Sequence, residues 1–286
     1  ALTGACAAVA LVDLHGGPTP SLYVANTGDA RVVLASRAPG DTTWLARALT
    51  QDQQPGNPDE LARMKREHPG EEATVAFRRS AKGPMRVIGG MMPSRSFGDA
   101  MFKWPLTTQK QVLTVLGTQA PVPPKGHRWN TSRFCYTPPY MTARPEVQHC
   151  ALDMSHDHAL VLATDGIFDR LSTTEAVETV VSFLQTAHKT DDVFAAFAAP
   201  PPEHPSRAVP VVAVGLPATT EEHDPHRAWK GAAFPPVRAD DNSATHLIRS
   251  ALDVGQGPLH TYRDLAIPPP MSRNRRDDMT VQVAWF

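Results

Sequence analysis

The chain has 286 residues, of which 41% are hydrophobic and 20% are charged, and its formal net charge is −1. This balance is typical of a globular protein with a sizeable core and excludes a disordered chain. A net charge near zero gives no electrostatic footprint for nucleic acid. No apolar run approaches the ~18 residues of a membrane-spanning helix. We therefore expect no nucleic-acid partner and no membrane span.

The cysteines indicate the redox compartment of the protein, and the first residues indicate where the protein begins. The chain has three cysteines, Cys6, Cys135 and Cys150, and no two of them have C-x-x-C spacing. An odd number of cysteines without this spacing favours a reducing compartment over a disulfide framework or a zinc site. The sequence starts at Ala1 inside an apolar pattern and shows no targeting segment. We therefore expect that the beginning of the protein lies further upstream.

Three short apolar runs follow, at residues 6–12, 21–26 and 31–35, with turn residues between them. The gaps leave no room for crossover helices, so the runs predict an antiparallel meander. Gly28 and Asp29 are then expected in a hairpin turn. There Asp29 is either an ordinary turn residue or a carboxylate displayed at the rim of a sheet.

The middle of the chain predicts one clear helix among irregular segments. Asn57 as N-cap and Pro58 in the first turn begin a helix that a His-Pro-Gly stretch ends. Residues 71–83 are expected to form a polar loop, and residues 85–92 a bent strand or turn. Residues 104–140 contain many prolines and are expected to be irregular.

An apolar run at residues 160–163 predicts a short buried strand. The run leads into Asp165 and then Gly166, where the backbone can turn sharply. A carboxylate at the end of a buried strand can face a crevice and bind a hard cation through oxygen. The alternative is that Asp165 caps the helix that follows.

The C-terminal part predicts two helices and a last strand. Residues 172–175, Ser-Thr-Thr-Glu, form a capping box that begins one helix, and residues 241–252 carry apolar side chains at helical spacing. Alternation over residues 279–286 predicts the last strand, just after Asp277. The proline-rich residues 199–236 are expected to be a surface insertion, because their composition cannot build a packed core.

Acidic residues recur at the ends of the predicted strands. Asp29, Asp165 and Asp277 each lie at a strand end or at a turn beside a strand, and Asp99 lies in a Gly-Asp turn. Acids far apart in sequence at such positions are what a Mg²⁺ or Mn²⁺ site requires. Two such ions about 3.5–4 Å apart lower the pKa of a bridging water and position a phosphoryl group for in-line attack. This chemistry needs no serine nucleophile, and the sequence has no G-x-S-x-G elbow and no P-loop.

A series of short motifs occurs in a fixed order along the chain. They are Leu-Tyr-Val-Ala-Asn-Thr-Gly-Asp-Ala-Arg at 22–31, Leu-Thr-Gln-Asp-Gln at 49–53, Arg-Glu-His-Pro at 66–69, Pro-Ser-Arg-Ser-Phe-Gly-Asp at 93–99, Phe-Lys-Trp at 102–104, Pro-Pro-Tyr at 138–140, Pro-Glu-Val at 145–147, Ala-Thr-Asp-Gly-Ile-Phe-Asp at 163–169 and Arg-Asp-Asp-Met-Thr-Val at 276–281. In this order they resemble the metal-dependent serine/threonine protein phosphatases of type 2C. The Glu-His-Pro and Phe-Lys-Trp pieces resemble the mitochondrial, pyruvate dehydrogenase phosphatase-like branch. The resemblance covers nearly the whole chain apart from the insertions.

The resemblance implies an α+β fold, a four-layer α-β-β-α sandwich of two antiparallel sheets flanked by helices, here incomplete at the N-terminus. It implies two or three Mg²⁺ or Mn²⁺ ions in the cleft between the sheets. Asp165 and Asp277 would ligate the core ions, and Asp29 a more weakly bound third ion. Asp278 would support these ligands without binding an ion itself.

Further polar positions have both functional and structural interpretations. For Asp99 a structural role and a position near the metals both remain open, and Arg95 is expected to be a structural donor within the same turn. His156 and His158 flank Asp157 in a pattern that could bind zinc, but a solvated turn is the interpretation we favour.

One departure from the family pattern concerns the residues that bridge the metals. The family carries an Asp-Gly-His-Gly-Gly motif whose aspartate bridges the two core ions, and an upstream arginine that binds phosphate. The similar Asp-Leu-His-Gly-Gly at residues 13–17 runs at once into the next strand, so we interpret it as a hairpin. The genuine motif is then expected upstream of Ala1. Residues 1–286 would form one catalytic domain that lacks its N-terminal segment and is inactive alone.

By the resemblance, the expected function is hydrolysis of phosphoserine and phosphothreonine in proteins by a metal-activated water. The expected substrate is a mitochondrial phosphoprotein such as pyruvate dehydrogenase, and the expected location is the mitochondrial matrix, otherwise the cytoplasm. The alternative is a catalytically inactive type 2C-like scaffold that binds a partner protein. A metal-dependent nuclease is disfavoured by the lack of basic character.

Overall fold

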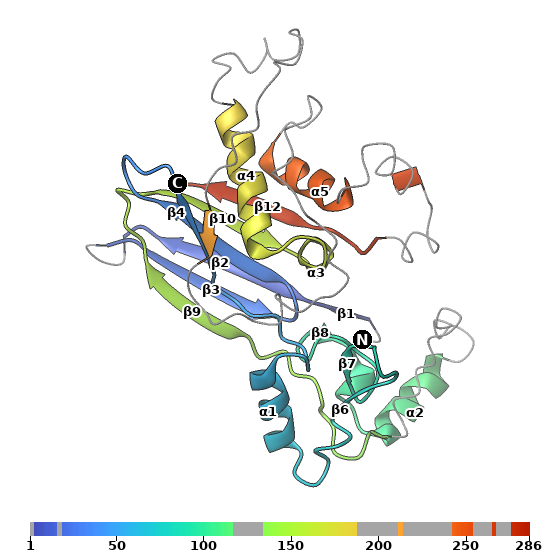
Figure 1. Cartoon of the computed structure of the whole chain (residues 1–286). Helices are drawn as coiled ribbons and strands as arrows, with labels where there is room; N and C mark the ends of the chain where they lie inside the picture. Colours follow the sequence, from blue (N-terminus) through green and yellow to red (C-terminus); the bar gives the residue numbers. More distant parts are fainter. Residues whose placement is uncertain are drawn as a thin grey trace. The chain divides into compact units, whose positions relative to one another are not determined.

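The structure is a computed structural model that describes residues 3–15, 19–116, 134–187, 211–213, 242–253, 265–266 and 276–286. These residues form an α+β fold (Figure 1). The chain divides into two compact units. The first unit comprises Ala1–Ala8, Ala25–Ala30 and Gln51–Val147, and the second comprises Val9–Val24, Arg31–Thr50 and Gln148–Phe286.

The second unit is built on a five-stranded sheet with the strand order β11-β5-β4-β10-β12. Its strands are β4 (Arg31–Arg37), β5 (Trp44–Ala48), β10 (Asp157–Ala163), β11 (Val211–Ala213) and β12 (Val281–Trp285). The apolar strand β10 pairs antiparallel with both β4 and β12, with Val161 opposite Val33 and Val283. Because β10 lies between two other strands, its backbone groups are paired on both sides, as an apolar buried strand requires.

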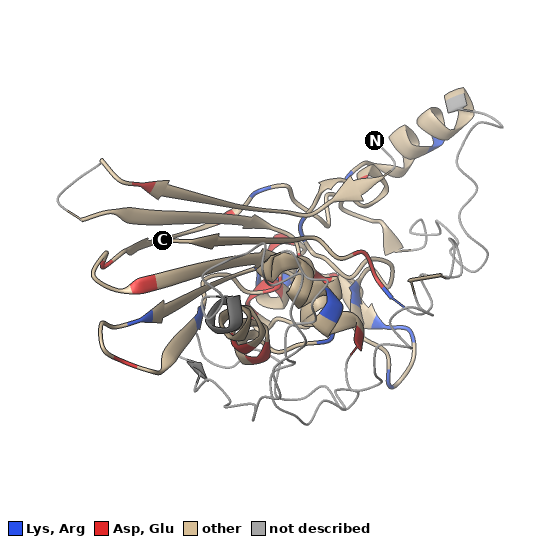
Figure 2. Ribbon diagram, turned by 90° about the horizontal axis from the view of Figure 1, so that it is seen from above, with Lys and Arg blue, Asp and Glu red and all other residues tan. Residues whose placement is uncertain are grey.

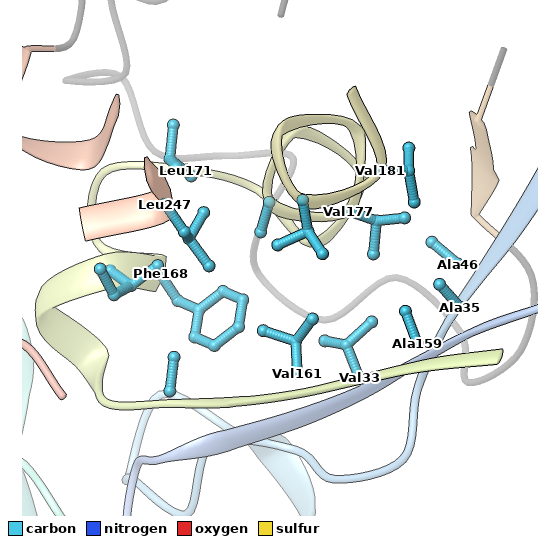
Figure 3. Close-up of a cluster of buried hydrophobic side chains, with 14 of the residues drawn as sticks. Val33, Ala35, Ala46, Ala159, Val161, Phe168, Leu171, Val177, Val181 and Leu247 are labelled. Atoms are coloured by element: carbon cyan, nitrogen blue, oxygen red, sulfur yellow. The ribbon is translucent and has the colours of Figure 1, made fainter. Parts of the chain in front are cut away.

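Two helices, α4 (Thr173–Ala187) and α5 (Ser243–Asp253), cover one face of this sheet (Figure 1). In Figure 3, Val33 and Val161 of the sheet lie opposite Val177 of α4, and Phe168 fills the space beside them. The buried cluster comprises Val33, Ala35, Trp44, Ala46, Ala159, Val161, Ala163, Ile167, Phe168, Leu171, Ala176, Val177, Val180, Val181, Leu247 and Ala251. Each fully buried Val, Leu, Ile or Phe stabilises the fold by about 1.5–3 kcal/mol. This cluster therefore holds the strand ends in place.

A three-stranded sheet, β2-β3-β9, is formed by β2 (Ala7–Asp13), β3 (Ser21–Thr27) and β9 (Glu146–Ala151). Its inner side chains are buried, with Leu22 at 0% exposure and Val24 at 1%. On the opposite face Val9, Leu11 and Tyr23 are 59%, 61% and 40% exposed. The alternation agrees with a sheet that is buried on one side. The helix layer expected on this outer face does not cover these side chains in the part of the chain that the structure describes.

The first unit combines helices with two small sheets. Its elements are β1 (Gly4–Ala5) paired with β8 (Phe97–Gly98), β6 (Ala76–Arg78) paired with β7 (Met85–Val87), α1 (Pro58–Glu67), the short 3₁₀ helix η1 (Ala100–Phe102) and α2 (Leu106–Leu116). Its core includes Met64 of α1, Val87, Phe102, Tyr140 and Met141, all less than 4% exposed. Helix α1 begins as the sequence predicts, because the backbone N–H of Asp59 donates to Asn57 Oδ1 at 3.0 Å.

A buried network of charged side chains joins α1 to later parts of the first unit. Glu60 is 2% exposed and accepts hydrogen bonds from Arg63 Nη2 at 2.8 Å, from Ser94 Oγ at 2.5 Å and from Arg95. Arg95 also donates to Glu146 Oε1 at 2.9 Å. Burial alone would raise the pKa of Glu60, but the hydrogen bonds from Arg95, Arg63 and Ser94 outweigh it and lower that pKa to about 2. The carboxylate of Glu60 is therefore a fixed negative charge that anchors α1.

The expectation of an antiparallel meander with a hairpin at Gly28 and Asp29 was wrong. Strands β3 and β4 belong to different sheets, so the turn with Gly28 and Asp29 is a crossing between sheets and not a hairpin of a meander. Gly28 has φ +118°, and a Cβ at this position would lie 2.2 Å from Cys6 Sγ. The crossing therefore needs a glycine for a reason that local turn preferences do not show.

Regular structure also occurs where the sequence predicts loops. Strand β6 lies within residues 71–83, and helix α2 lies within the proline-containing residues 104–140. Pro105 only precedes the first turn of α2, where a missing N–H is tolerated, so it does not break the helix. The prolines at 121, 123 and 124 lie outside the described residues.

The expected insertion at residues 199–236 is described only at Val211–Ala213, which form β11. This strand pairs parallel with β5, with Val212 opposite Leu45. The five-stranded sheet is therefore mixed and not purely antiparallel as expected. The last predicted elements are confirmed, since α5 and β12 lie close to the expected ranges. Among the described residues, no helix is both long and apolar enough to cross a membrane.

Candidate active site

Thr164 connects the end of β10 to the stretch that precedes β12. Its Oγ1 donates to the carbonyl oxygen of Asp278 at 3.0 Å, and the backbone N–H of Thr280 donates to the same Oγ1 at 3.1 Å. The Thr164 N–H also donates to the carbonyl of Thr280 at 3.1 Å. These bonds extend the antiparallel pairing of the two strands beyond its last ladder pair. They hold the segments that carry Asp165 and Asp277 side by side.

A glycine allows these two segments to approach closely. A Cβ placed on Gly166 would lie 2.5 Å from the carbonyl oxygen of Asp278. No other residue fits this contact without moving the backbone, because real Cβ atoms do not come so close. The Asp-Gly sequence therefore serves the packing of the site as well as the turn.

Asp165 is the first residue of the short helix α3 (Asp165–Phe168). The N-cap position belongs to Thr164, so the alternative in which Asp165 itself caps the helix is wrong. Asp165 and Asp277 are both half-buried, whereas Asp278 is exposed. The backbone N–H of Asp278 donates to Asp277 Oδ1 at 2.8 Å. This bond orients the Asp277 carboxylate, so here Asp278 acts through its backbone.

Arg31 helps to position the candidate site, and the strand and turn patterns of the sequence do not identify it. It begins β4, is 5% exposed and donates from Nη1 to Thr173 Oγ1 at 3.2 Å. Its guanidinium carbon lies 4.4 Å from the centre of the Phe168 ring, a cation–π distance. Arg31 therefore fixes α3 and the start of α4 against the sheet. The only sequence signal is its place as the last residue of the family-like motif at 22–31.

Asp29 belongs to the first unit, while Asp165 and Asp277 belong to the second. It is 8% exposed, and Cys6 Sγ donates to its Oδ1 at 3.2 Å. The Gln53 side chain accepts from the N–H of Gly28 at 2.7 Å and so fixes the preceding residue. Asp29 is thus held by side chains from far along the chain, which an ordinary turn residue does not require.

The contacts of Asp99 and Arg95 fit structural roles. Asp99 is 5% exposed, adopts φ +48° and accepts from Ser96 Oγ at 2.7 Å. Arg95 donates to Glu60 of α1 and to the carbonyl of Arg144 at 3.1 Å. Arg95 therefore ties its turn to other segments, and the expectation that it donates within the turn was wrong.

His158 is an internal structural residue and not part of a solvated turn. It is 4% exposed, and its ring nitrogens lie 2.8 Å from Ser36 Oγ and 2.9 Å from the carbonyl of Asp153. The neighbouring Asp157 accepts from Arg37 Nε at 3.0 Å. Across the described ranges, no three His, Cys, Asp or Glu side chains gather as a metal-ligand cluster.

Asp13 ends β2, and its Oδ1 accepts the backbone N–H of His15 at 3.0 Å. Strands β2 and β3 are neighbours in one sheet, and residues 14–20 are too few for a crossover between parallel strands. The short connection agrees with the hairpin that the sequence predicts, and the hairpin itself stays a prediction. Gly16 and Gly17 of the Asp-Leu-His-Gly-Gly stretch lie outside the described residues.

Comparison with known proteins identifies the family. The model of the family described as Protein phosphatase 2C matches residues 1–199. Since this is more than half of the chain, the protein belongs to the protein phosphatase 2C family. The matched range includes the motifs that surround Asp29 and Asp165, whereas Asp277 lies beyond it.

Curated relatives match over the whole chain. A protein phosphatase 2C homolog of Schizosaccharomyces pombe is 33% identical over 290 residues, which are 100% of this chain and 53% of that protein. The human mitochondrial pyruvate dehydrogenase (acetyl-transferring) phosphatases 1 and 2 are 32% and 34% identical, each over 100% of this chain and 48% of their own length. A solved serine-threonine phosphatase 2C from Toxoplasma gondii is 16% identical, with a TM-score of 0.39 over 93% of this chain and 54% of that one. The chain spans about half the length of the curated relatives it matches.

Proposed function

We propose that the protein is a metal-dependent protein serine/threonine phosphatase. The observation that carries this proposal is the hydrogen bonding around Thr164, which holds the segments of Asp165 and Asp277 side by side in a chain of the protein phosphatase 2C family. Two half-buried carboxylates at adjacent strand ends can provide two of the oxygen ligands that a hard cation needs.

The donor chemistry at this strand end fits Mg²⁺ or Mn²⁺. Carboxylate oxygens are the ligands that these hard cations prefer, and water completes their coordination. Asp165 and Asp277 would hold the core ions, and Asp29 a further, weaker one. When bound, such ions polarise a phosphoryl oxygen and lower the pKa of a water for attack. The chain itself positions the carboxylates, through Thr164 and the backbone N–H of Asp278.

The proposed substrate is a phosphoserine or phosphothreonine in a mitochondrial protein. Relatives 32% and 34% identical to this chain are named as mitochondrial phosphatases of pyruvate dehydrogenase. We therefore place pyruvate dehydrogenase first among candidate substrates and the mitochondrial matrix first among candidate locations.

The test uses the full-length protein, because residues 1–286 are expected to be inactive alone. It combines calorimetric titration with Mn²⁺ and hydrolysis of a phosphothreonine peptide. Asp165→Asn and Asp277→Asn are each expected to weaken Mn²⁺ binding and to reduce turnover by at least about 100-fold, because each removes a charged ligand. Asp13→Asn is the matched control and is expected to change neither quantity. Turnover that persists in EDTA, or in both ligand variants, would exclude the metal-dependent mechanism.

The second candidate function is a non-catalytic scaffold with the phosphatase 2C fold. The observation that favours it is the hydrogen bond between the His15 N–H and Asp13 Oδ1, which engages the aspartate of the Asp-Leu-His-Gly-Gly stretch at the end of β2. A scaffold is expected to show cooperative unfolding but no Mn²⁺ binding and no phosphopeptide hydrolysis. Mn²⁺-dependent turnover that disappears in Asp165→Asn would exclude it.

A further inference from the structure

A cavity of about 250 Å³ lies in the second unit, and neither Asp165 nor Asp277 lines it. It is lined by Leu22, Val24, Arg47, Ala48, Leu49, Gln148, His149 and Cys150. These residues come from β3, from the end of β5 and from β9, so the cavity lies between the two sheets. It is smaller than the pockets of about 300–1,000 Å³ that bind drug-sized ligands.

The strand register separates this cavity from the candidate active site. Arg47 pairs with Leu34, and Leu34 pairs with Leu160 of β10. Asp165 lies five residues beyond Leu160 along the chain, past the end of β10. At about 3.3 Å per strand residue, the cavity is several strand positions away from the cation-binding end of the sheet. A molecule in the cavity would therefore not contact Asp165.

The walls of the cavity divide into an apolar part and a cationic part. Leu22, Val24 and Leu49 are 0%, 1% and 7% exposed and form a permanent apolar wall. Arg47 lines the same cavity, and within the described part of the chain no ion pair or hydrogen bond of its guanidinium is found. A guanidinium is always charged and offers a planar fork of donors that matches a carboxylate.

We propose that this cavity binds a compact organic monocarboxylate, with the carboxylate on Arg47 and the apolar body against Leu22, Val24 and Leu49. An apolar pocket with one convergent charged group is the usual form of a small-molecule site. The Arg–carboxylate pair is bidentate, which fixes the orientation of the ligand. The size of the cavity limits the ligand to a single ring or a short branched chain. Cys150 also lines the cavity, so a bound ligand would cover its thiol and slow the reaction of the thiol with an alkylating reagent.

The first experiment measures binding of cyclohexanecarboxylate by calorimetry, in EDTA so that no divalent ion contributes. Arg47→Gln is expected to weaken binding at least about tenfold, because a hydrogen-bonded charge pair is lost. Arg47→Lys is expected to retain part of the affinity, since it keeps the charge but not the fork. Arg66→Gln removes an exposed arginine of α1 and is the matched control, with unchanged affinity expected.

The ligand series tests the apolar wall separately from the charge. Each methylene removed from the ligand is expected to weaken binding by roughly fourfold at most, so acetate should not bind measurably. Equal binding of acetate, or of inorganic phosphate, would show a simple anion site and overturn the proposal. Binding that Arg47→Gln leaves unchanged would overturn it as well.

A second measurement needs no variant and so does not depend on the folding of one. The rate of alkylation of Cys150 by iodoacetamide is followed by peptide mass spectrometry with and without cyclohexanecarboxylate. The ligand is expected to slow alkylation of Cys150 at least about fivefold, in keeping with burial of most of a ligand in its pocket, and to leave the rate at Cys6 unchanged. An unchanged rate at Cys150 under saturating ligand would show that the cavity is not the binding site.

Discussion

At Gly166 the hydrogen atom in place of a side chain lets two segments of the second unit come into contact. The carbonyl oxygen of Asp278 lies 2.5 Å from the position that a Cβ would take. Thr164, at the same strand end, forms hydrogen bonds with both Asp278 and Thr280. Gly166 and Thr164 therefore decide how the segments of Asp165 and Asp277 are arranged. The same argument applies to Gly28, whose missing side chain makes room for Cys6.

Gly166→Ala is expected to lower the free energy of unfolding by about 1–3 kcal/mol, because the added methyl group overlaps the carbonyl of Asp278. Urea denaturation measures the change. Gly56→Ala is the matched control, since no atom lies within 4 Å of its added Cβ. The control is expected to be neutral or to stabilise by about 0.4–1 kcal/mol. Equal effects of the two substitutions would refute the contact.

Among the elements, α1 depends on a buried charge network. Glu60 accepts from Arg63, Ser94 and Arg95, and these bonds keep its carboxylate ionised inside the first unit. A buried charge is costly unless it is paired, so the helix and the turn around Arg95 stabilise each other.

The stability of the protein should fall in acid because of Glu60. Its pKa is lowered to about 2 from an ordinary value of 4.5, so the unfolded chain binds this proton first. The contribution is fully present above pH 4.5 and is lost as the pH falls from about 4.5 to 2. Linkage makes it on the order of 3 kcal/mol. Guanidinium denaturation at a series of pH values measures the slope.

Glu60→Gln is expected to flatten this slope and to destabilise the protein at pH 7, because Arg95 loses a buried partner. Glu67→Gln is the control, since Glu67 pairs with the same Arg63 but is 51% exposed in its side chain. The slope of the control should match that of the unchanged protein. If both variants keep the full slope, another carboxylate is responsible.

Helix α4 has a local start signal that the structure confirms. The backbone N–H of Ser172 donates to Glu175 Oε2 at 2.6 Å, and the N–H of Glu175 donates to Ser172 Oγ at 3.3 Å. Ser172→Ala is expected to cost about 1 kcal/mol, whereas Ser172→Thr keeps the hydroxyl and should cost less. Thermal unfolding compares the two. An identical loss for both would mean that the cap does not stabilise the fold.

At the scale of the whole molecule, acidic and basic residues are interspersed along the described ribbon (Figure 2), in agreement with the net charge of −1. The two units each have a buried cluster of their own. Of the proline-rich residues 199–236, only β11 is described, and it pairs with β5 at the edge of the large sheet. Because a proline-rich composition cannot build a packed core, the rest of the segment is expected to contribute little beyond that strand.

Replacement of residues 214–236 by a short Gly-Ser linker is expected to change the melting temperature by less than about 3 °C, because loop length adds little to the closure entropy. In the full-length protein, turnover of a small phosphate ester should also be kept. Val212→Pro is the contrasting variant, since it removes an N–H from β11, and it is expected to lower the melting temperature more. Loss of soluble protein on deletion would show that the segment belongs to the core.

Local patterns predict those elements whose signals are local. The N-cap Asn57, the capping box at Ser172 and the alternation before Phe286 each need only a few neighbouring residues, and each is confirmed. The order of short motifs along the chain also suffices to recognise the family. Asp165 and Asp277 were identified as candidate ligands for the same reason, since strand-end acids can be seen in the sequence.

What only the tertiary structure decides is how distant segments meet. The sequence cannot show that β3 and β4 enter different sheets, because both read as consecutive short strands. It cannot show that His158 is buried between Ser36 and Asp153, or that Gly166 faces the carbonyl of Asp278. Ser36 lies 122 residues from His158 along the chain, and such long-range packing, not local preference, fixes these contacts. The cavity at Arg47 exists for the same reason, since three strands far apart in sequence form its walls.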